Sequence, residues 1–428
     1  MNTTTDKIKK NDKTIYHFHG YVELDKDEVI CSHCGEKMYI NQSYPINVKH
    51  IPIGGVYSSL IIEKHQLMCN ECGATKMQNI PFLYKNHAIT NVVKNYICDL
   101  LSTNKFTNTD IAEITGVNRN IVKEIDKERL QKLYTLNGDG NIFIKSENYA
   151  KYLGIDEFKL HKGYVYATHI IDYATGHIIW IAKGKKKQVV YDFIDHVGLE
   201  WMSHVEAVAC DMNSDFEEAF KDKCPWITIV YDYFHIVKNF NEKVINKVRI
   251  EEQERLKKEG KEEEAKKLKH SKYILCSNEE TLAKKDKDAE EGKVIQKESK
   301  LFDTNEVKRK GGKLQKLYEL INNNEILLLI EIIKEILIEA YKCNNKEEME
   351  KLIFEIMELC EESKNKHLLW FKNLLYNHYD GIVSHATIKI SSGKIEGINN
   401  KIKTARRQAY GYPDDEYFFL KVVDLSRH

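Results

Sequence analysis

The chain has 428 residues, 42% of them hydrophobic, and its 65 basic and 65 acidic residues give a net charge of zero. This length is enough for two to four domains with a sizeable core. The zero net charge offers no global attraction for nucleic acid, so a DNA-binding surface would have to be a local feature.

The sequence predicts no membrane insertion. The N-terminal stretch MNTTTDKIKKNDK is polar and lacks the apolar core of a signal peptide. The most apolar run, residues 325–343, contains Glu331, Lys334 and Glu335, which is too much charge for a membrane-spanning helix. We therefore expect a cytoplasmic protein with no membrane partner, whose ten cysteines are thiols or metal ligands instead of disulfides.

Residues 1–86 are predicted to form a zinc-binding β module. Two CxxCG sequences, Cys31-Ser-His-Cys34-Gly and Cys69-Asn-Glu-Cys72-Gly, each present two thiolates on a tight turn that a glycine permits. Four thiolates complete a tetrahedral site for a structural Zn²⁺. The alternatives are unmetallated cysteines or a redox pair, and His33 or His65 could replace a cysteine ligand. Residues 51–56, with two consecutive glycines, predict a hairpin turn between the two cysteine pairs.

Residues 87–134 are predicted to form a helix-turn-helix DNA-binding domain. A short helix from Thr107, a turn at Gly116 and a second helix with Ile121, Val122 and Ile125 facing inward fit this motif. The start of the second helix would enter a major groove. The side chains placed to reach bases or phosphates there are Asn118, Arg119, Asn120 and Lys123. The alternative is an ordinary helical hairpin. Residues 135–150 read as a linker.

Residues 151–239 show strand-like and helical segments in alternation. The expected strands end at Asp156, Ile171, Ala182, Asp211 and Tyr231, with helices at about 187–197 and 215–221. Functional side chains collect at strand ends, where the backbone is fixed and the side chain reaches a crevice. Asp156 and Asp211 are therefore candidate catalytic residues.

Two further aspartates also follow strand-like runs. Asp172 precedes a Thr-Gly turn and is most simply a turn residue. Asp232 and His235 could support the site, but a histidine beside a sheet is more often structural.

Residues 240–378 form a long segment rich in Lys and Glu, which we interpret as an all-α insertion into a catalytic core whose last part is residues 379–428. Its charged run at 251–270 is typical of a solvated helix or a flexible arm, and it could also contact DNA or a second subunit.

The stretch 391–412 predicts a helix whose apolar stripe includes Ile395, Ile398 and Ile402, with Glu396 and Asn399 on the polar side. Its basic residues, which would neutralise DNA phosphates, are Lys401, Lys403, Arg406 and Arg407. The alternative is a surface helix with a solvated basic face. Asp156, Asp211 and Glu396 together make a candidate carboxylate triad for two divalent cations, which can clamp the oxygens of a phosphoryl displacement.

Several strings in the sequence resemble the ISL-three family of bacterial insertion-sequence transposases. They are GIDEF around Asp156, CDM around Asp211, YDYFHIVK at 231–238, and EGINNKIK followed by AYGY. The resemblance implies a multidomain α+β protein with an RNase H-like mixed α/β catalytic core of the DDE type. It implies that Asp156, Asp211 and Glu396 are the acidic triad, that Asp232 and His235 lie near it, and that Mg²⁺, or Mn²⁺ as a substitute, binds there.

The resemblance also implies a function. The chain would bind the terminal inverted repeats of its element as double-stranded DNA, cleave the strands and transfer them to target DNA, as a homo-oligomer associated with the bacterial nucleoid. One alternative is a sequence-specific DNA-binding regulator, or an inactive remnant, that does no catalysis. Another is a metal-dependent nuclease of repair or RNA processing.

Overall fold

The computed structural model describes residues 5–10, 13–85, 87–135, 149–161, 163, 165–212, 214–296, 306–308, 310–390, 393–408 and 413–428. Its internal contacts divide the chain into two compact units, Met1–Lys145 with Arg406–His428, and Ser146–Ala405. The Asn137-Gly-Asp-Gly140 part of the predicted linker and the AYGY string lie outside the described residues.

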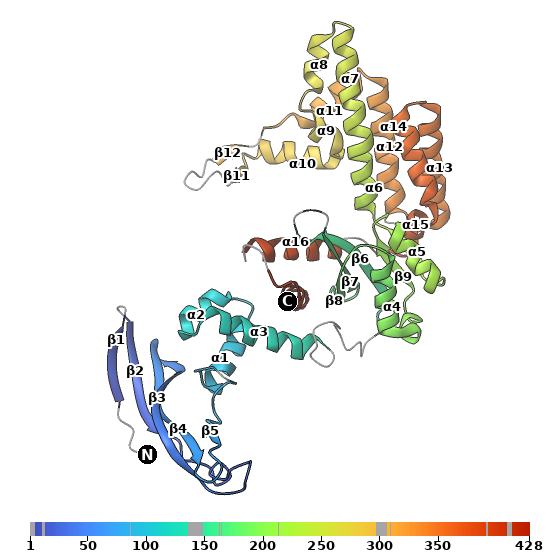
Figure 1. The fold of residues 1–428 in the computed structure, drawn as a ribbon. Coiled ribbons are helices and arrows are strands. Elements are labelled where there is room, and N and C mark those ends of the chain that lie inside the picture. The colour runs from blue at the N-terminus through green and yellow to red at the C-terminus, as the bar shows by residue number, and fades with distance from the viewer. Residues whose placement is uncertain are drawn as a thin grey trace. The chain divides into compact units, whose positions relative to one another are not determined.

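The first unit begins with a sheet of five strands (Figure 1, blue). They are β1 (Thr5–Lys10), β2 (Lys13–Tyr21), β3 (Met38–Ile53), β4 (Val56–Cys69) and β5 (Thr75–Met77). The strand order is β1-β2-β4-β3, with β5 paired to β4, and only the β2–β4 pair is parallel. Ile53 pairs with Val56 across Gly54 and Gly55, which confirms the predicted hairpin turn. The turn brings the two CxxC sequences to the same end of the β3–β4 ribbon.

Three helices follow the sheet in the same unit: α1 (Asn91–Ser102), α2 (Asn108–Thr115) and α3 (Arg119–Tyr134). Thr107 caps α2 in a reciprocal capping box with Asp110, and Gly116 ends that helix in the left-handed conformation with φ of 68°. Val122 and Ile125 are fully buried between the helices with Ile97 and Ile111, which confirms two of the three predicted inward-facing residues. Ile121, the third, is only partly buried.

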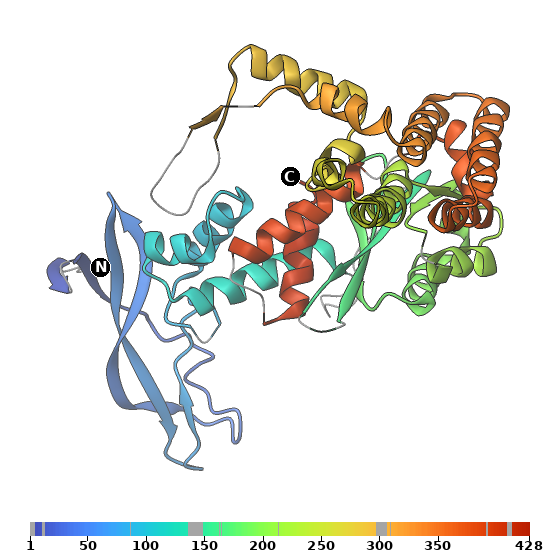
Figure 2. The same ribbon diagram turned by 90° about the horizontal axis from the view of Figure 1, so that it is seen from above.

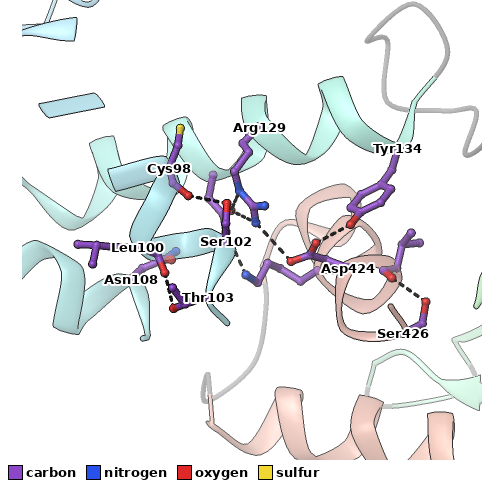
Figure 3. A network of polar contacts seen from close by, with 12 residues as sticks. Cys98, Leu100, Ser102, Thr103, Asn108, Arg129, Tyr134, Asp424 and Ser426 are labelled. Carbon is purple, nitrogen blue, oxygen red and sulfur yellow. Dashed lines mark hydrogen bonds and ion pairs between the residues drawn. The ribbon is translucent and has the colours of Figure 1, made fainter. Parts of the chain in front are cut away.

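The last helix of the chain, α17 (Asp415–Leu425), belongs to this first unit and packs against α3. The sequence predicts residues 379–428 to be the last part of the catalytic core, whereas the contacts of α17 in the structure group it with the first unit. Figure 3 shows the polar contacts that join the two helices, in which Arg129 and Tyr134 of α3 both reach Asp424. Arg129 donates to Asp424 Oδ2 at 3.3 Å, and the Tyr134 hydroxyl donates to Asp424 Oδ1 at 2.6 Å.

Asp126 is the fully buried centre of this interface. Its carboxylate accepts hydrogen bonds from Arg129 at 2.9 Å and from the Tyr417 hydroxyl at 2.7 Å, and it lies 3.1 Å from Lys421 Nζ. A buried carboxylate is tolerated when charged donors surround it in this way.

Replacing Asp126 with alanine is expected to lower the free energy of unfolding of this unit by about 3–5 kcal/mol, because Lys421 loses its carboxylate partner and Arg129 keeps only Asp424. Urea unfolding followed by circular dichroism measures the change. Asp99→Ala, which removes an exposed carboxylate from α1, is the control and should be nearly neutral. Equal effects of the two substitutions would contradict the assignment of Asp126 as the centre of the interface between α3 and α17.

The second unit contains a mixed sheet with the order β10-β9-β6-β7-β8. Its strands are β6 (Tyr152–Lys159), β7 (Tyr166–Asp172), β8 (Ile178–Lys183), β9 (Ala207–Cys210) and β10 (Thr228–Tyr231). Strands β10, β9 and β6 are parallel, whereas β6, β7 and β8 form an antiparallel meander. The connecting helices α4 (Lys187–Met202) and α5 (Ser214–Lys223) bury Phe193, Trp201, Phe216 and Phe220 in the core of the unit. The alternation of strands and helices is therefore as predicted.

A helical region follows β10 and contains most of the remaining helices (Figure 1). Its elements are α6 (Tyr233–Asn239), a π-helix (Phe240–Ile245), α7 (Asn246–Lys258), α8 (Glu262–Leu268), α9 (Lys272–Cys276), α10 (Glu279–Glu290), α11 (Lys313–Ile321), α12 (Glu325–Lys342), α13 (Lys346–Glu362), α14 (Lys366–Asn377), α15 (Tyr379–Val383) and a 3₁₀ turn (Ser384–Ala386). Within the described ranges, no helix is long and apolar enough to cross a membrane.

The prediction of an all-α insertion is wrong in one place. Strands β11 (Val294–Gln296) and β12 (Glu306–Lys308) form a short antiparallel pair that follows α10, as Figure 2 shows in gold. Gly292, with φ of 69°, stops the helix, and the β-branched residues Val294, Ile295 and Val307 favour extended backbone.

Candidate functional site

Asp156 and Asp211 lie on neighbouring parallel strands of the second unit. The β6–β9 pairing ends at Gly154 and Ala209, so each aspartate lies two residues beyond the last paired position of its strand. Asp211 directly follows β9, as predicted. The prediction that a strand ends at Asp156 is wrong, because β7 keeps pairing with β6 as far as Lys159. Asp156 nevertheless lies where the parallel partner stops, at the same edge as Asp211.

Both carboxylates line one small pocket. Its lining residues are Ile155, Asp156, Ala209, Cys210, Asp211, Asp232, His235 and Ile395. His235 Nδ1 lies 3.2 Å from Asp211 Oδ1. Burial raises the pKa of Asp156 above its ordinary value, and the neighbouring charge of Asp211 adds to the increase. The backbone amide of Glu157 and the side chain of Asn399 oppose it by stabilising the ionised form.

Asp232 has a local structural role beside this pocket. It directly follows β10 and caps α6, with Oδ2 accepting a hydrogen bond from the Phe234 amide at 2.9 Å. Its side chain is buried, with 3% exposed. The helix that it starts carries His235 on its first turn, so the cap helps to position the imidazole beside Asp211. The helix then continues into the π-helix.

Glu396 lies on the first turn of α16 (Gly393–Gln408). Ile395, Ile398, Ile402 and Ala405 are buried, which confirms the predicted apolar stripe. Ile395 lines the pocket, whereas Glu396 is half-buried beside it and is not among the lining residues. The structure thus brings two members of the predicted triad into one pocket and places the third on the helix that covers it.

Helix α16 approaches strand β6 at a glycine. A Cβ built on Gly154 would lie 2.8 Å from Ile395 Cδ1 and 2.9 Å from Ile395 Cγ1, closer than real side chains pack. The absence of a side chain at Gly154 therefore lets the Glu396 helix lie directly on the strand that carries Asp156.

Replacing Gly154 with alanine is expected to destabilise the second unit by about 1–3 kcal/mol, because the added methyl displaces Ile395. Thermal unfolding measures the change. Gly397→Ala is the matched control on α16, where a new Cβ would meet nothing within 4 Å. The control should stabilise by about 0.5–1 kcal/mol through helix propensity, so the two substitutions should have opposite signs. Stabilisation by both would show that the contact at Gly154 is loose.

The four cysteines of the two CxxCG sequences converge in the first unit. The Sγ atoms of Cys31 and Cys72 and those of Cys34 and Cys69 are 3.5 Å apart, and Cys34 and Cys72 are separated by 3.6 Å. Zn–S bonds of about 2.3 Å in a tetrahedron require sulfur atoms about 3.8 Å apart, so the thiols fit a structural Zn²⁺. Among the residues that the structure describes, these four cysteines are the one group of three or more His, Cys, Asp or Glu side chains that lie close enough to share a metal ion.

The two halves of this site are built alike. The Gly35 amide donates to the Cys31 carbonyl and the Gly73 amide donates to the Cys69 carbonyl, each at 2.9 Å. Both glycines have positive φ, 76° and 73°. Hydrogen bonds from the backbone amides of Cys34 and His33 lower the pKa of Cys31 to about 6.

The predicted DNA contacts on α3 differ in their surroundings. Asn118 caps the helix by accepting from the Asn120 amide at 2.8 Å, and Arg119 and Asn120 are exposed. Lys123 is engaged inside the protein, since its Nζ lies 3.1 Å from Asp414 Oδ2 and 5.3 Å from the ring centroid of Tyr417. On α16, Lys401, Lys403 and Arg407 are exposed and Arg406 is half-buried.

Sequence reasoning assigned no role to Asn399, the side chain that contacts Asp156. Its Nδ2 donates to Asp156 Oδ2 at 2.6 Å. The only signal in the sequence is an amide three residues after Glu396 on the same helix face.

Comparisons with known proteins find relatives over most of the chain. A family model of the ISL3 type, described as "Transposase", matches residues 153–422, and one described as the zinc-finger of transposase IS204/IS1001/IS1096/IS1165 matches residues 27–72. The transposase for insertion sequence element IS1001 of Bordetella parapertussis is 24% identical over 405 residues, 94% of this chain and 90% of that protein. The transposase for insertion sequence element IS1557 of Mycobacterium tuberculosis is 28% identical over 85 residues, 20% of this chain and 19% of that protein.

Proposed function

Because the chain belongs to the ISL3 family of transposases, we propose that it binds the terminal inverted repeats of its own insertion sequence and catalyses divalent-metal-dependent strand cleavage and strand transfer. The observation that carries this proposal is the convergence of Asp156 and Asp211 in one pocket at the edge of a mixed sheet. The strand order β10-β9-β6-β7-β8, with an antiparallel meander followed by parallel strands, supports an RNase H-like core of the DDE type.

The residues at the pocket suit hard divalent cations. Carboxylate oxygens are the ligands that Mg²⁺ and Mn²⁺ prefer. Burial, and to a smaller extent the charge of Asp211, raises the pKa of Asp156, and a bound cation would offset both by stabilising the ionised carboxylate. Asp156 and Asp211 would hold the ions, with Glu396 as the third ligand. When bound, two ions supply Lewis-acid activation of the attacking oxygen and neutralise charge on the leaving oxygen.

Other side chains would orient these ligands. His235 contacts Asp211 through Nδ1, so it limits the rotation of that carboxylate. The exposed basic residues of α16 would neutralise phosphates next to the cut. The reaction needs no covalent intermediate on the protein, because water and then the freed 3′-OH are the nucleophiles.

DNA recognition belongs to the first unit in this proposal. Helices α2 and α3, joined through Gly116, would act as a helix-turn-helix, with Arg119 and Asn120 exposed at the start of α3. The zinc ribbon would stabilise the sheet beside them. Phosphate contacts would fix the register, base contacts would select the repeat, and two copies of the chain would hold two ends.

An in-vitro cleavage assay on DNA that carries the flanks of the gene tests this function. Cuts at the repeat ends in Mg²⁺ that disappear in EDTA are the expected result. Tight binding of the ends without cutting in Mg²⁺ would indicate a DNA-binding regulator instead. The absence of both binding and cutting would contradict the helix-turn-helix assignment.

A further inference from the structure

Asn399 makes a short hydrogen bond to a proposed catalytic carboxylate. Its Nδ2 lies 2.6 Å from Asp156 Oδ2. The amide nitrogen is the donor, so the NH₂ group of Asn399 faces the carboxylate and its Oδ1 points away from it. Its Oδ1 is buried and has no protein partner among the described residues. An unsatisfied amide oxygen costs about 1–3 kcal/mol, which indicates that the contact with Asp156 determines how this side chain is placed.

Two contacts between α16 and β6 bear on how the helix lies over the strand. One is this hydrogen bond, and the other is the packing of Ile395 on Gly154. Asn399 follows Ile395 by four helical residues, a rise of about 6.0 Å, and Asp156 follows Gly154 by two strand residues, a rise of about 6.6 Å. The nearly equal steps let both contacts form along the same two elements. Together they fix the register of the helix over the strand.

The register matters because α16 also carries Glu396. Residues three apart on a helix lie on the same face, so the side chain that contacts Asp156 has Glu396 as its neighbour. A helix shifted by one residue would rotate Glu396 by about 100° away from that face.

We propose that Asn399 is a positioning residue that holds the Asp156 carboxylate in one orientation and sets the register that brings Glu396 to the metal site. This inference rests on the proposed transposase function. Asn399 acts through Asp156 and Glu396 and takes no part in bond making.

Manganese binding tests the inference without relying on activity. The zinc-loaded full-length chain is titrated with Mn²⁺ and followed by electron paramagnetic resonance, and the site is identified as the binding that Asp211→Asn removes. Asn399→Leu keeps the branched shape of the native side chain but cannot donate a hydrogen bond. It is expected to raise the Mn²⁺ dissociation constant about 10- to 100-fold, as loss of a residue that orients a metal ligand typically does.

Two further variants separate the amide from packing and folding. Asn399→Ala also lacks the donor but adds no bulk, so it should weaken Mn²⁺ binding to the same extent. Asn400→Leu makes the same substitution at the next position, which is exposed, and should leave the affinity unchanged. Thermal unfolding and binding of the repeat DNA should be close to wild type for all three variants. In the cleavage assay, the two Asn399 variants should have a lower kcat and an unchanged KM for DNA.

Wild-type Mn²⁺ affinity in both Asn399 variants would overturn the positioning role while leaving the proposed function intact. Equal weakening in Asn400→Leu would also overturn it, because the effect would then belong to the helix as a whole. If Asp211→Asn binds Mn²⁺ as the wild type does, the proposed function is contradicted, and the inference fails with it.

Discussion

Substitution of Asp156 or Asp211 with asparagine is expected to reduce strand cleavage by at least about 10³-fold and to leave binding of the terminal repeats unchanged. Each change keeps the size of the side chain and removes the negative charge that would hold a divalent cation, and metal stabilisation of a phosphoryl transition state is worth several kcal/mol. Both carboxylates line the same pocket, so the loss of either one is expected to prevent metal binding there. Repeat binding should survive because its proposed residues lie in the first unit.

The measurement compares cleavage and gel-shift binding on one DNA substrate. Asp195→Asn is the control, since Asp195 is an exposed carboxylate on α4 of the same unit that pairs with Lys223 at the surface. Glu396→Gln should behave like the two aspartate variants if the third carboxylate completes the site. Cleavage that persists in any one of the three variants removes that residue from the triad, and an equal loss in Asp195→Asn would attribute the effect to folding.

Features that depend on local sequence were predicted well. The hairpin between the cysteine pairs follows from two adjacent glycines, and the convergence of four thiols follows from two matched CxxCG turns. The order of strands and helices in the second unit also follows from local alternation. The hairpin and each CxxCG turn are determined by residues that are close in sequence, and the matched spacing of the two turns indicates that they share one metal ion.

Features that depend on contacts between distant segments were not predicted. Arg129 and Asp424 are 295 residues apart, and no pattern within α17 indicates that it belongs with α3. The proximity of Lys123 to Asp414 and Tyr417 is also not indicated by any residue near it in the sequence. The role of Asn399 emerges only when α16 is seen to lie on β6, because an amide on a polar helix face is otherwise an ordinary surface residue.

Removal of zinc is expected to abolish repeat binding. It is also expected to unfold the end of the β3–β4 ribbon that carries the cysteines. Cys69 is fully buried with Met38 and Leu67 in a small cluster that has few other apolar contacts. Metal binding in structural zinc sites contributes on the order of 10 kcal/mol of folding free energy, far more than so small a cluster supplies. Cys69→Ser should therefore lose one equivalent of zinc, the protection of β3–β4 amides from hydrogen exchange, and repeat binding.

Zinc content, hydrogen exchange and gel shift are measured on the same preparation. Cys343→Ser is the control, because this half-buried thiol lies in the second unit outside the cysteine cluster and should change none of the three. Mn²⁺ binding at the carboxylate pocket of Cys69→Ser should remain, since the second unit has its own core. Full zinc content in Cys69→Ser would contradict a four-cysteine site. Loss of zinc with repeat binding retained would show instead that the ribbon does not support the recognition helices.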